Sequence, residues 1–288
     1  MSEMAASQID ELIERLKDRK GRRPEVSKLN GDLIRAVENN DLKAIRQLLR
    51  QGADPNTKTD RPVLFACRGK AVIQLLVNAG ADPGAVADGD TFGHYVIKMA
   101  YEGNVRKALE VLVTAGLDIN ARDGLGCTML HWATLSKHVE VARWLLSRGA
   151  DIVADDHGST PLHWASDWHR PAVVELLLDA GAGKFINAFG PDGLTPLLGA
   201  IHHGVERIDC IGDFQQTLYL LFKAGAKLNV NAETESDSYR WDELKEEDPE
   251  IAVLVLEQQS MARRDLLTEI ASRSPVSRTS EPSKRGEL

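Results

Sequence analysis

The sequence of 288 residues predicts an all-α solenoid of about six helix-turn-helix units, with helical extensions at its N- and C-terminal ends. The first observation is an internal repeat, because residues 126–151 realign with residues 158–183 after a shift of 32 positions. His131 then falls on His163. The second observation is that apolar residues in each copy recur at helical spacing and end at a glycine. A pair of short helices copied at a fixed spacing is typical of a stacked array.

Composition and charge narrow the classes of partner. The chain is 43% hydrophobic and 27% charged, which is typical of a soluble globular protein. Its formal net charge of −8 makes nucleic acid an unfavourable partner. The apolar run at residues 251–256 is far shorter than the roughly 20 residues of a membrane-spanning helix. The N-terminus is too charged for a secretory signal, so we expect a cytoplasmic protein with no nucleic-acid or membrane partner.

The cysteines give no sign of a disulfide or a metal site. Cys67, Cys127 and Cys210 lie far apart and without a paired spacing. Reduced thiols are the simplest expectation for a cytosolic chain. A zinc site would need ligands from several distant segments, so the sequence predicts no metal and no cofactor.

Residues 1–29 predict a helix and a basic linker in front of the repeats. One face of this helix carries Ile9, Leu12, Ile13 and Leu16. The following stretch "RKGRRP" (residues 19–24) is expected to be a solvated linker, and a nuclear signal is the alternative.

The repeat array is expected over residues 30–236. A copy begins with a short helix such as "TMLHWATL", in which Thr128 can satisfy free backbone N–H groups. A second helix follows, and Gly149 supplies its C-terminal stop. Connectors rich in Asp, Asn and Gly favour tight turns. The recognisable copies lie at residues 33–56, 61–83, 108–120, 126–151, 158–183 and 193–229.

The repeats differ in length. The glycines that end them, from Gly52 to Gly225, are separated by 28, 36, 33, 32 and 44 residues. The second repeat is therefore trimmed and the sixth carries an insertion near residues 204–216. Such an insertion is either a loop on the binding face or a lengthened helix pair.

At these residues the sequence resembles the ankyrin repeat family. The family pattern DxxGxTPLHxA, followed by VxxLL and GADxN, is met almost fully from Asp155 to Gly181 and nearly as well from Asp123 to Asp151. The resemblance implies that the histidines are hydrogen-bonding struts between neighbouring repeats, and that two tryptophans pack. The motif residues are Thr128, His131, Thr160 and His163, and the tryptophans are Trp132 and Trp164.

The resemblance also implies a binding surface, because the variable pair at the end of each first helix lines the concave face in the family. The second repeat is too short to assign. The pairs in the other repeats are Glu38 and Asn39, Tyr101 and Glu102, Leu135 and Ser136, Asp167 and Trp168, and His202 and His203. Trp168 is the strongest candidate, since tryptophan is enriched among residues that dominate interface energy. The alternative is that Trp168 folds onto a neighbouring repeat.

Turn tips would form the other half of such a surface. These candidates are Gly124, Leu125, Cys127, Asp156, His157, Ser159, Asp192 and Leu194.

The sequence does not predict an enzyme. It has no phosphate-binding GxxxxGK[ST] loop, no GxSxG and no HExxH motif. Cys127 and His131 are explained by the repeat turn. His202 and His203 could join His169 on a metal, but adjacent helical residues point in different directions.

Residues 237–273 predict a helical cap of one long or two short helices, since a stack needs a unit that covers its last apolar face. A helix that binds elsewhere is the alternative. The tail of residues 274–288 has little apolar content and is expected to be disordered.

These observations predict a non-enzymatic protein that binds another protein through its concave face and turn tips, to mask or recruit it. The alternatives are an immunity or inhibitor protein against a toxin or enzyme, and a secreted effector acting in a host cell. A self-assembling scaffold and an enzyme that uses the sixth repeat are the remaining hypotheses. The identity of the partner and the oligomeric state are left open.

Overall fold

A computed structural model shows the chain as two compact units, Met1–Pro161 and Leu162–Leu288, which are described one at a time. The structure describes residues 26–99, 105–135, 139–205, 211–228 and 249–273. The predicted helix and linker before residue 26, the segment 237–248 and the tail 274–288 lie outside these ranges.

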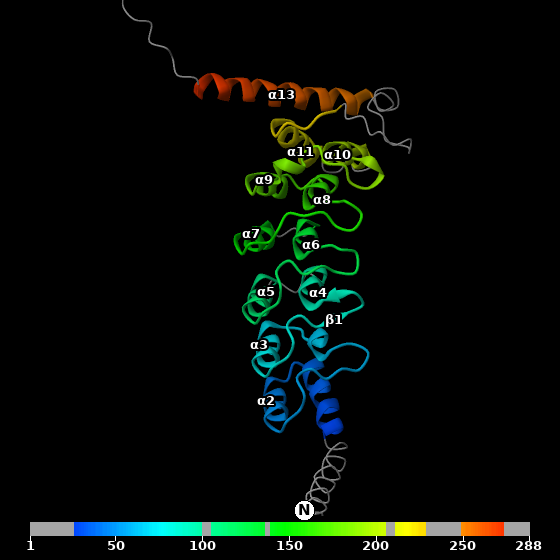
Figure 1. Ribbon diagram of the computed structural model, residues 1–288, viewed down its shortest axis with the longest axis vertical. Coiled ribbons are helices and arrows are strands. Elements are labelled where there is room, and N and C mark those ends of the chain that lie inside the picture. The colour runs from blue at the N-terminus through cyan, green and yellow to red at the C-terminus, as the bar shows by residue number, and fades with distance from the viewer. Residues whose placement is uncertain (1–25, 100–104, 136–138, 206–210, 229–248, 274–288) are drawn as a thin grey trace, which may run out of the picture. The chain divides into compact units, whose positions relative to one another are not determined.

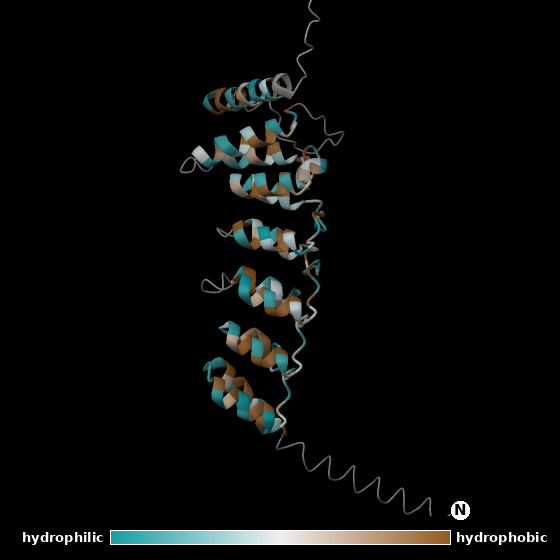
Figure 2. Cartoon of the chain, turned by 90° about the vertical axis from the view of Figure 1, so that its left-hand side faces the viewer, coloured by the Kyte–Doolittle hydropathy of each residue, from teal (hydrophilic) through white to brown (hydrophobic). Residues whose placement is uncertain are grey.

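The first unit is a series of antiparallel helix pairs joined by turns (Figure 1). Residues 26–38 are helical and precede α2. Its other elements are α2 (Leu42–Arg50), η1 (Val63–Ala66), α3 (Lys70–Asn78), β1 (Val86–Ala87), β2 (Asp90–Thr91), α4 (Phe92–Lys98), α5 (Val105–Thr114), α6 (Met129–Leu135) and α7 (Val139–Ser147). Figure 2 shows hydrophobic residues in every helix of this unit, with the longer connecting turns on one side of the helices. The core therefore lies between successive helix pairs.

Local sequence fixes where the helices begin and end. The Asp41 side chain accepts hydrogen bonds of 3.0 Å from the N–H groups of Lys43 and Ala44, which caps α2. A glycine in the left-handed region ends each second helix, because only glycine adopts this conformation without steric cost. These glycines and their φ angles are Gly52 (94°), Gly80 (97°), Gly116 (109°), Gly149 (89°), Gly181 (93°) and Gly225 (95°).

The trimmed second repeat lacks a first α-helix. A single 3₁₀ turn, η1, replaces it and buries Val63, Leu64 and Phe65. The next connector forms a short antiparallel hairpin in which Val86 pairs with Thr91. The shortening seen in the glycine spacing thus falls on the first helix and not on α3.

The second unit consists of helix pairs closed by one long helix. Its elements are α8 (Pro161–Asp167), α9 (Pro171–Asp179), η2 (Ala182–Phe185), η3 (Pro191–Gly193), α10 (Pro196–Val205), α11 (Ile211–Lys223) and α13 (Pro249–Arg273). α10 has 10 residues and α11 has 13, against 7 and 9 for α8 and α9. The described part of the insertion therefore extends two helices, whereas residues 206–210 lie outside the described ranges.

α13 is a single helix of 25 residues that packs against α11. It buries Ala252, Val255 and Ala262. Two polar contacts accompany this packing: the Tyr219 hydroxyl donates to Asp265 at 2.7 Å, and Lys223 Nζ lies 2.7 Å from Glu269 Oε1. α13 thus covers a face of α11 that would otherwise be open.

Three asparagines join successive turns within the units. In each case the Nδ2 group donates to an oxygen of the next turn and Oδ1 accepts from its backbone N–H. Asn56 donates to Gly80 O at 2.9 Å, Asn120 to Asp151 Oδ2 at 2.8 Å and Asn187 to Gly225 O at 3.2 Å. The asparagine that follows the glycine at the end of a repeat is therefore a connector between successive turns.

Candidate protein-binding surfaces

The motif histidines are buried inside the units. The Thr128 N–H donates to His131 Nδ1 at 3.0 Å, so the proton lies on Nε2, which donates to the Ser159 carbonyl at 3.1 Å. His163 makes the equivalent bond from Nε2 to the Ala188 carbonyl at 3.0 Å. Thr128, His131, Thr160 and His163 have almost no exposed surface, so their side chains hold the turns and do not face a partner.

His94 is a third strut, which the sequence analysis missed. The Thr91 hydroxyl lies 2.8 Å from His94 Nδ1, and Nε2 donates to the Cys127 carbonyl at 3.1 Å. Thr91 and His94 keep the threonine-to-histidine spacing, but Phe92 and Gly93 replace the expected Pro-Leu. Burial lowers the pKa of both His94 and His131 below the ordinary histidine value, because desolvation disfavours the charged ring.

Asp123 organises the turn before α6. Its Oδ1 accepts from the N–H groups of Leu125 and Cys127 at 2.9 Å, and its Oδ2 accepts from the Trp132 indole at 2.8 Å. Burial of Asp123 opposes ionisation, but these hydrogen bonds and one from Lys98 outweigh it and lower the pKa. Lys98 Nζ also lies 3.8 Å from the centre of the Trp132 ring. Trp132 is thus half-buried, with its ring packed against Lys98 and its indole N–H bonded to Asp123.

The predicted turn-tip residues divide into exposed and buried groups. Leu125 is 51% exposed, and Gly124, Asp156 and His157 are also exposed. Cys127 and Ser159 are buried because the backbone turns inward to meet the aspartates, so the expectation that their side chains face a partner is wrong. Leu194 is half-buried, and the side chain of Asp192 lies outside the described part.

Cys127 has no nucleophilic character. Burial and the nearby carboxylates of Asp123 and Asp155 raise the pKa of its thiol to about 12. Burial also raises the pKa of Cys67 well above the ordinary value. Because the thiolate is the reactive form, both thiols are held in their unreactive form, and the Cys127 thiol donates to Asp155 Oδ2 at 3.7 Å.

Trp168 lies at the end of α8 and is 44% exposed. The next residue, His169, has a φ of 47° and is buried. Its Nε2 donates to the Ala200 carbonyl at 2.9 Å, and its ring meets Phe214 edge-on at 5.2 Å. This bond brings the end of α8 beside α10, the helix that carries His202 and His203. His169 is already bonded inside the unit and is not a candidate metal ligand.

Asp167, at the end of α8, and His202 and His203, on α10, are half-buried. The Asp167 carboxylate lies so close to α10 that a Cβ on Gly199 would stand 2.1 Å from Oδ1. The rings of His202 and His203 are 5.0 Å apart. We call Asp167, Trp168, His202 and His203 the Trp168 patch. Trp168 is its most exposed member.

The candidate stripe is less complete in the first unit. Glu38 and Asn39 are exposed, and Leu135 is half-buried. Tyr101, Glu102 and Ser136 lie outside the described residues.

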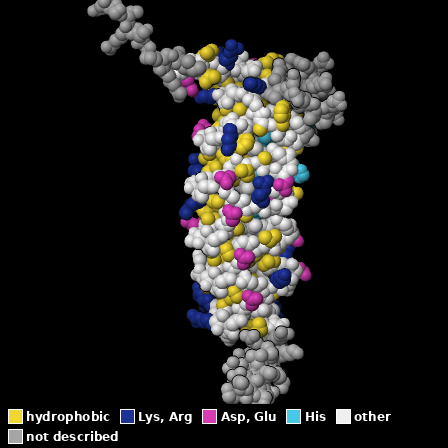
Figure 3. Space-filling model, viewed as in Figure 1, with side chains coloured by type: hydrophobic (Ala, Val, Ile, Leu, Met, Phe, Trp, Pro, Cys, Tyr) yellow, Lys and Arg dark blue, Asp and Glu magenta, His cyan; other side chains and the backbone are white. Residues whose placement is uncertain are grey.

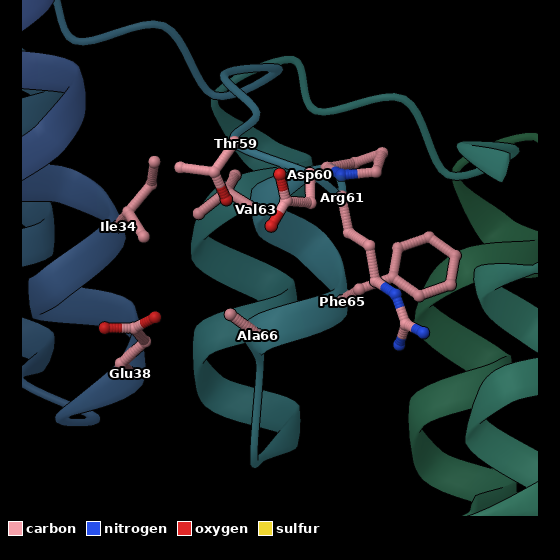
Figure 4. Close-up of a pocket in the computed structure, with 9 residues that line it drawn as sticks. Ile34, Glu38, Thr59, Asp60, Arg61, Val63, Phe65 and Ala66 are labelled. Atoms are coloured by element: carbon pink, nitrogen blue, oxygen red, sulfur yellow. The ribbon is translucent and has the colours of Figure 1, made fainter. Parts of the chain in front are cut away.

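A pocket of about 250 Å³ lies beside the trimmed second repeat (Figure 4). Ile34, Val63 and Ala66 supply apolar walls, and the Glu38 and Asp60 carboxylates project from its two sides. The Arg61 side chain extends along Phe65 and ends in an ion pair with Asp88 at 2.5 Å. The pocket therefore suits a side chain with an apolar stem and a positive end.

The described ranges contain no group of three or more His, Cys, Asp or Glu side chains placed to hold a metal ion. Within the same ranges, no helix combines the length and apolar character needed to cross a membrane.

The family model described as "Ankyrin repeats (3 copies)" matches residues 33–123 and 96–189. Cyclin-dependent kinase 4 inhibitor B of Bos taurus is 35% identical over 126 residues, which are 42% of this chain and 95% of that protein. B-cell lymphoma 3 protein of Homo sapiens is 36% identical over 146 residues, covering 50% of this chain and 30% of that protein.

The mitochondrial disaggregase of Bos taurus is 36% identical over 129 residues, which are 41% of this chain and only 18% of that protein. The chain thus spans a minor part of some of the proteins it resembles. Among solved structures, the ankyrin repeat domain of Bcl-3 matches with a TM-score of 0.58 and 27% identity, over 69% of this chain and 88% of the other.

Proposed function

Because this chain belongs to the ankyrin repeat family, whose repeats are typically protein–protein interaction modules, we propose that it is a non-enzymatic recognition protein that masks or recruits a protein partner. The partner contacts the concave face, which the ends of the first helices line in this family, and the turn tips. The observation that carries this proposal is the exposed Trp168 of the Trp168 patch. Tryptophans in such positions dominate the energy of many interfaces.

The surroundings of Trp168 support its role as an anchor. His169 is fixed by its bond to the Ala200 carbonyl, and its backbone N–H donates to Ser166 O at 3.0 Å. The backbone that carries the indole is therefore ordered before any partner arrives. An ordered anchor lowers the entropy that binding must overcome.

The first unit offers a second surface with different chemistry. Leu125 gives an exposed apolar tip, and Asp156 and His157 stand on the next turn. Arg122 lies 3.1 Å from Asp156 and joins the two turns. A turn tip with one apolar and several polar groups suits the polar rim and small apolar centre of a protein interface.

The protonation of Cys127 and the net charge of the chain both support a protein-binding role without catalysis. The protonated Cys127 thiol gives no nucleophile beside His131. The net charge of −8 disfavours nucleic acid, so we propose a protein partner. Separately, we propose that the two meet in the cytoplasm.

An inhibitor is the more specific form of this proposal. The relative of which this chain covers 95% is named as an inhibitor of cyclin-dependent kinase 4. The acidic balance, together with Glu38 and Asp60 in the pocket, suits a basic target such as a toxin or enzyme. A secreted effector is the alternative, and detection of the protein outside its producing cell distinguishes the two.

The test is an affinity capture with the immobilised full-length chain, comparing wild type, Trp168→Ala and Phe189→Ala. Phe189 is a matched control, because it is also 44% exposed in the second unit but lies outside the Trp168 patch. We expect Trp168→Ala to lose a partner that Phe189→Ala keeps. With the isolated partner, calorimetry should show that Trp168→Ala weakens the binding free energy by about 2 kcal/mol, which is roughly a 30-fold rise in Kd. Equal retention by both variants would place the interface elsewhere.

A further inference from the structure

α13 has a second apolar face, on the side away from α11. Val255 and Ala262 are buried, whereas Val253 is 55%, Leu256 44% and Leu267 58% exposed. Figure 3 shows hydrophobic and basic side chains next to one another along this helix. Large apolar side chains that recur on one exposed helix face mark an interaction surface more often than scattered ones do.

The exposed residues follow the spacing of a coiled-coil seam. Val253, Leu256, Ser260, Arg263 and Leu267 are separated alternately by three and four residues. This spacing places them in line along one side of a helix that pairs with another helix. All five side chains are exposed. We call them the α13 seam.

The charged residues beside the α13 seam are placed so that two identical helices running antiparallel bring opposite charges together. Glu257 and Arg264 lie seven residues apart on the same edge, and both are exposed. Seven residues are about 10 Å along a helix, so the two charges do not pair within one chain. When a second, identical helix runs antiparallel, each glutamate meets the arginine of the other copy.

We propose that α13 pairs with α13 of a second copy of this chain, antiparallel and about a two-fold axis between Met261 and Ala262. Leu256 of one copy then packs against Leu267 of the other, and Ser260 faces Arg263 at the centre. Glu257 faces Arg264, and the symmetry makes each of these contacts twice. One register therefore packs the leucines of the seam together and pairs the opposite charges that flank it.

The α13 seam is short, so the dimer that it forms should be weak. Two heptads of helix bury much less than the roughly 1,600 Å² of a standard interface. We expect a reversible dimer with a Kd on the order of 10–100 µM. The pairing uses no residue of the Trp168 patch, so it is independent of the recognition function proposed above.

The experiment is sedimentation equilibrium of the full chain from about 10 µM to about 500 µM. We expect the mass to rise from 31.6 kDa towards twice that value with concentration. Glu257→Arg and Arg264→Glu should each weaken the dimer about tenfold, because each places like charges opposite one another. The double variant Glu257→Arg/Arg264→Glu should restore it, because the swapped charges pair again.

Glu175→Arg is the matched control, since Glu175 is an exposed glutamate on α9 in the same unit. It makes the same change in net charge away from the seam and should leave the dimer intact. A mass that stays at one chain throughout, a dimer that the single variants leave unchanged, or a double variant that stays weak would each overturn the proposal. A constant single-chain mass would also leave this face to a different protein.

Discussion

Trp168 and His169 are neighbours in the sequence with opposite environments. Trp168 is exposed, whereas His169 is 3% exposed and hydrogen-bonded to a carbonyl 31 residues away. The repeat register was sufficient to assign Trp168 to the end of a first helix. It could not predict His169, because a left-handed histidine depends on its contact with α10 and Phe214. Long-range contacts of this kind leave no periodic signal in the sequence.

The buried His94 and His131 make stability depend on pH. Their folded-state pKa values lie below the unfolded value of about 6.5, so protonation favours the unfolded chain. Their contribution is complete above that pH and is lost as the pH falls. Protonation of His131 Nδ1 also removes the acceptor for the Thr128 N–H. We expect the free energy of unfolding in urea to be lower at pH 5.5 than at pH 7.5.

Substitution of a single strut tests this cause. His131→Gln should cost about 1–3 kcal/mol at neutral pH, because a glutamine that donates to the Ser159 carbonyl cannot also accept from the Thr128 N–H, and should reduce the pH dependence. His157→Gln, at an exposed turn tip, is the control. An unchanged pH dependence in His131→Gln would show that other groups cause the loss at low pH.

At the scale of elements, the sequence predicted the fold class and the second helices well. The family match and the Bcl-3 structure confirm an ankyrin array, and six glycines end helices in the left-handed region. The 3₁₀ turn η1, which replaces the first helix of the second repeat, was not predictable, because a run as short as residues 63–66 has no helical period. His94 was missed because Phe92 and Gly93 interrupt the motif.

α13 gives a direct test at this scale, since it carries the same residue type on opposite faces. Val255→Asp should destabilise the second unit by about 3 kcal/mol or more, because it places an unpaired carboxylate in a buried site. Val253→Asp should cost less than about 0.5 kcal/mol, because Val253 is 55% exposed. Urea unfolding at low protein concentration measures both. Similar losses in the two variants would contradict the assignment of the faces.

At the scale of the whole molecule, the chain forms two compact units instead of one closed core. In an array, each repeat contacts only its neighbours, so stability is close to a sum of local terms. The described ranges of the first unit have their own struts, His94 and His131, and their own connectors, Asn56 and Asn120.

Two separate units predict that a destabilising substitution in one unit leaves the structure of the other unit unchanged. Val255→Asp should accelerate amide hydrogen exchange in α11 and α13, while α3 and α5 keep their protection, because they belong to the first unit. Exchange followed by mass spectrometry resolves these helices. A uniform loss of protection along the chain would show that the two units unfold together.

The three asparagine connectors are also positions where hydrolysis of a side-chain amide would weaken the contact between successive turns. Slow hydrolysis of an asparagine amide yields aspartate, which has no N–H to donate. At Asn56 this change would set an acceptor oxygen where Nδ2 now lies 2.9 Å from the Gly80 carbonyl, and two oxygens would repel. The same change at Asn187 would face the Gly225 carbonyl, and at Asn120 the Asp151 carboxylate. Each event would replace one of the two hydrogen bonds of a connector by a repulsive contact and leave the bond to Oδ1 in place, so the contact between successive turns would weaken stepwise.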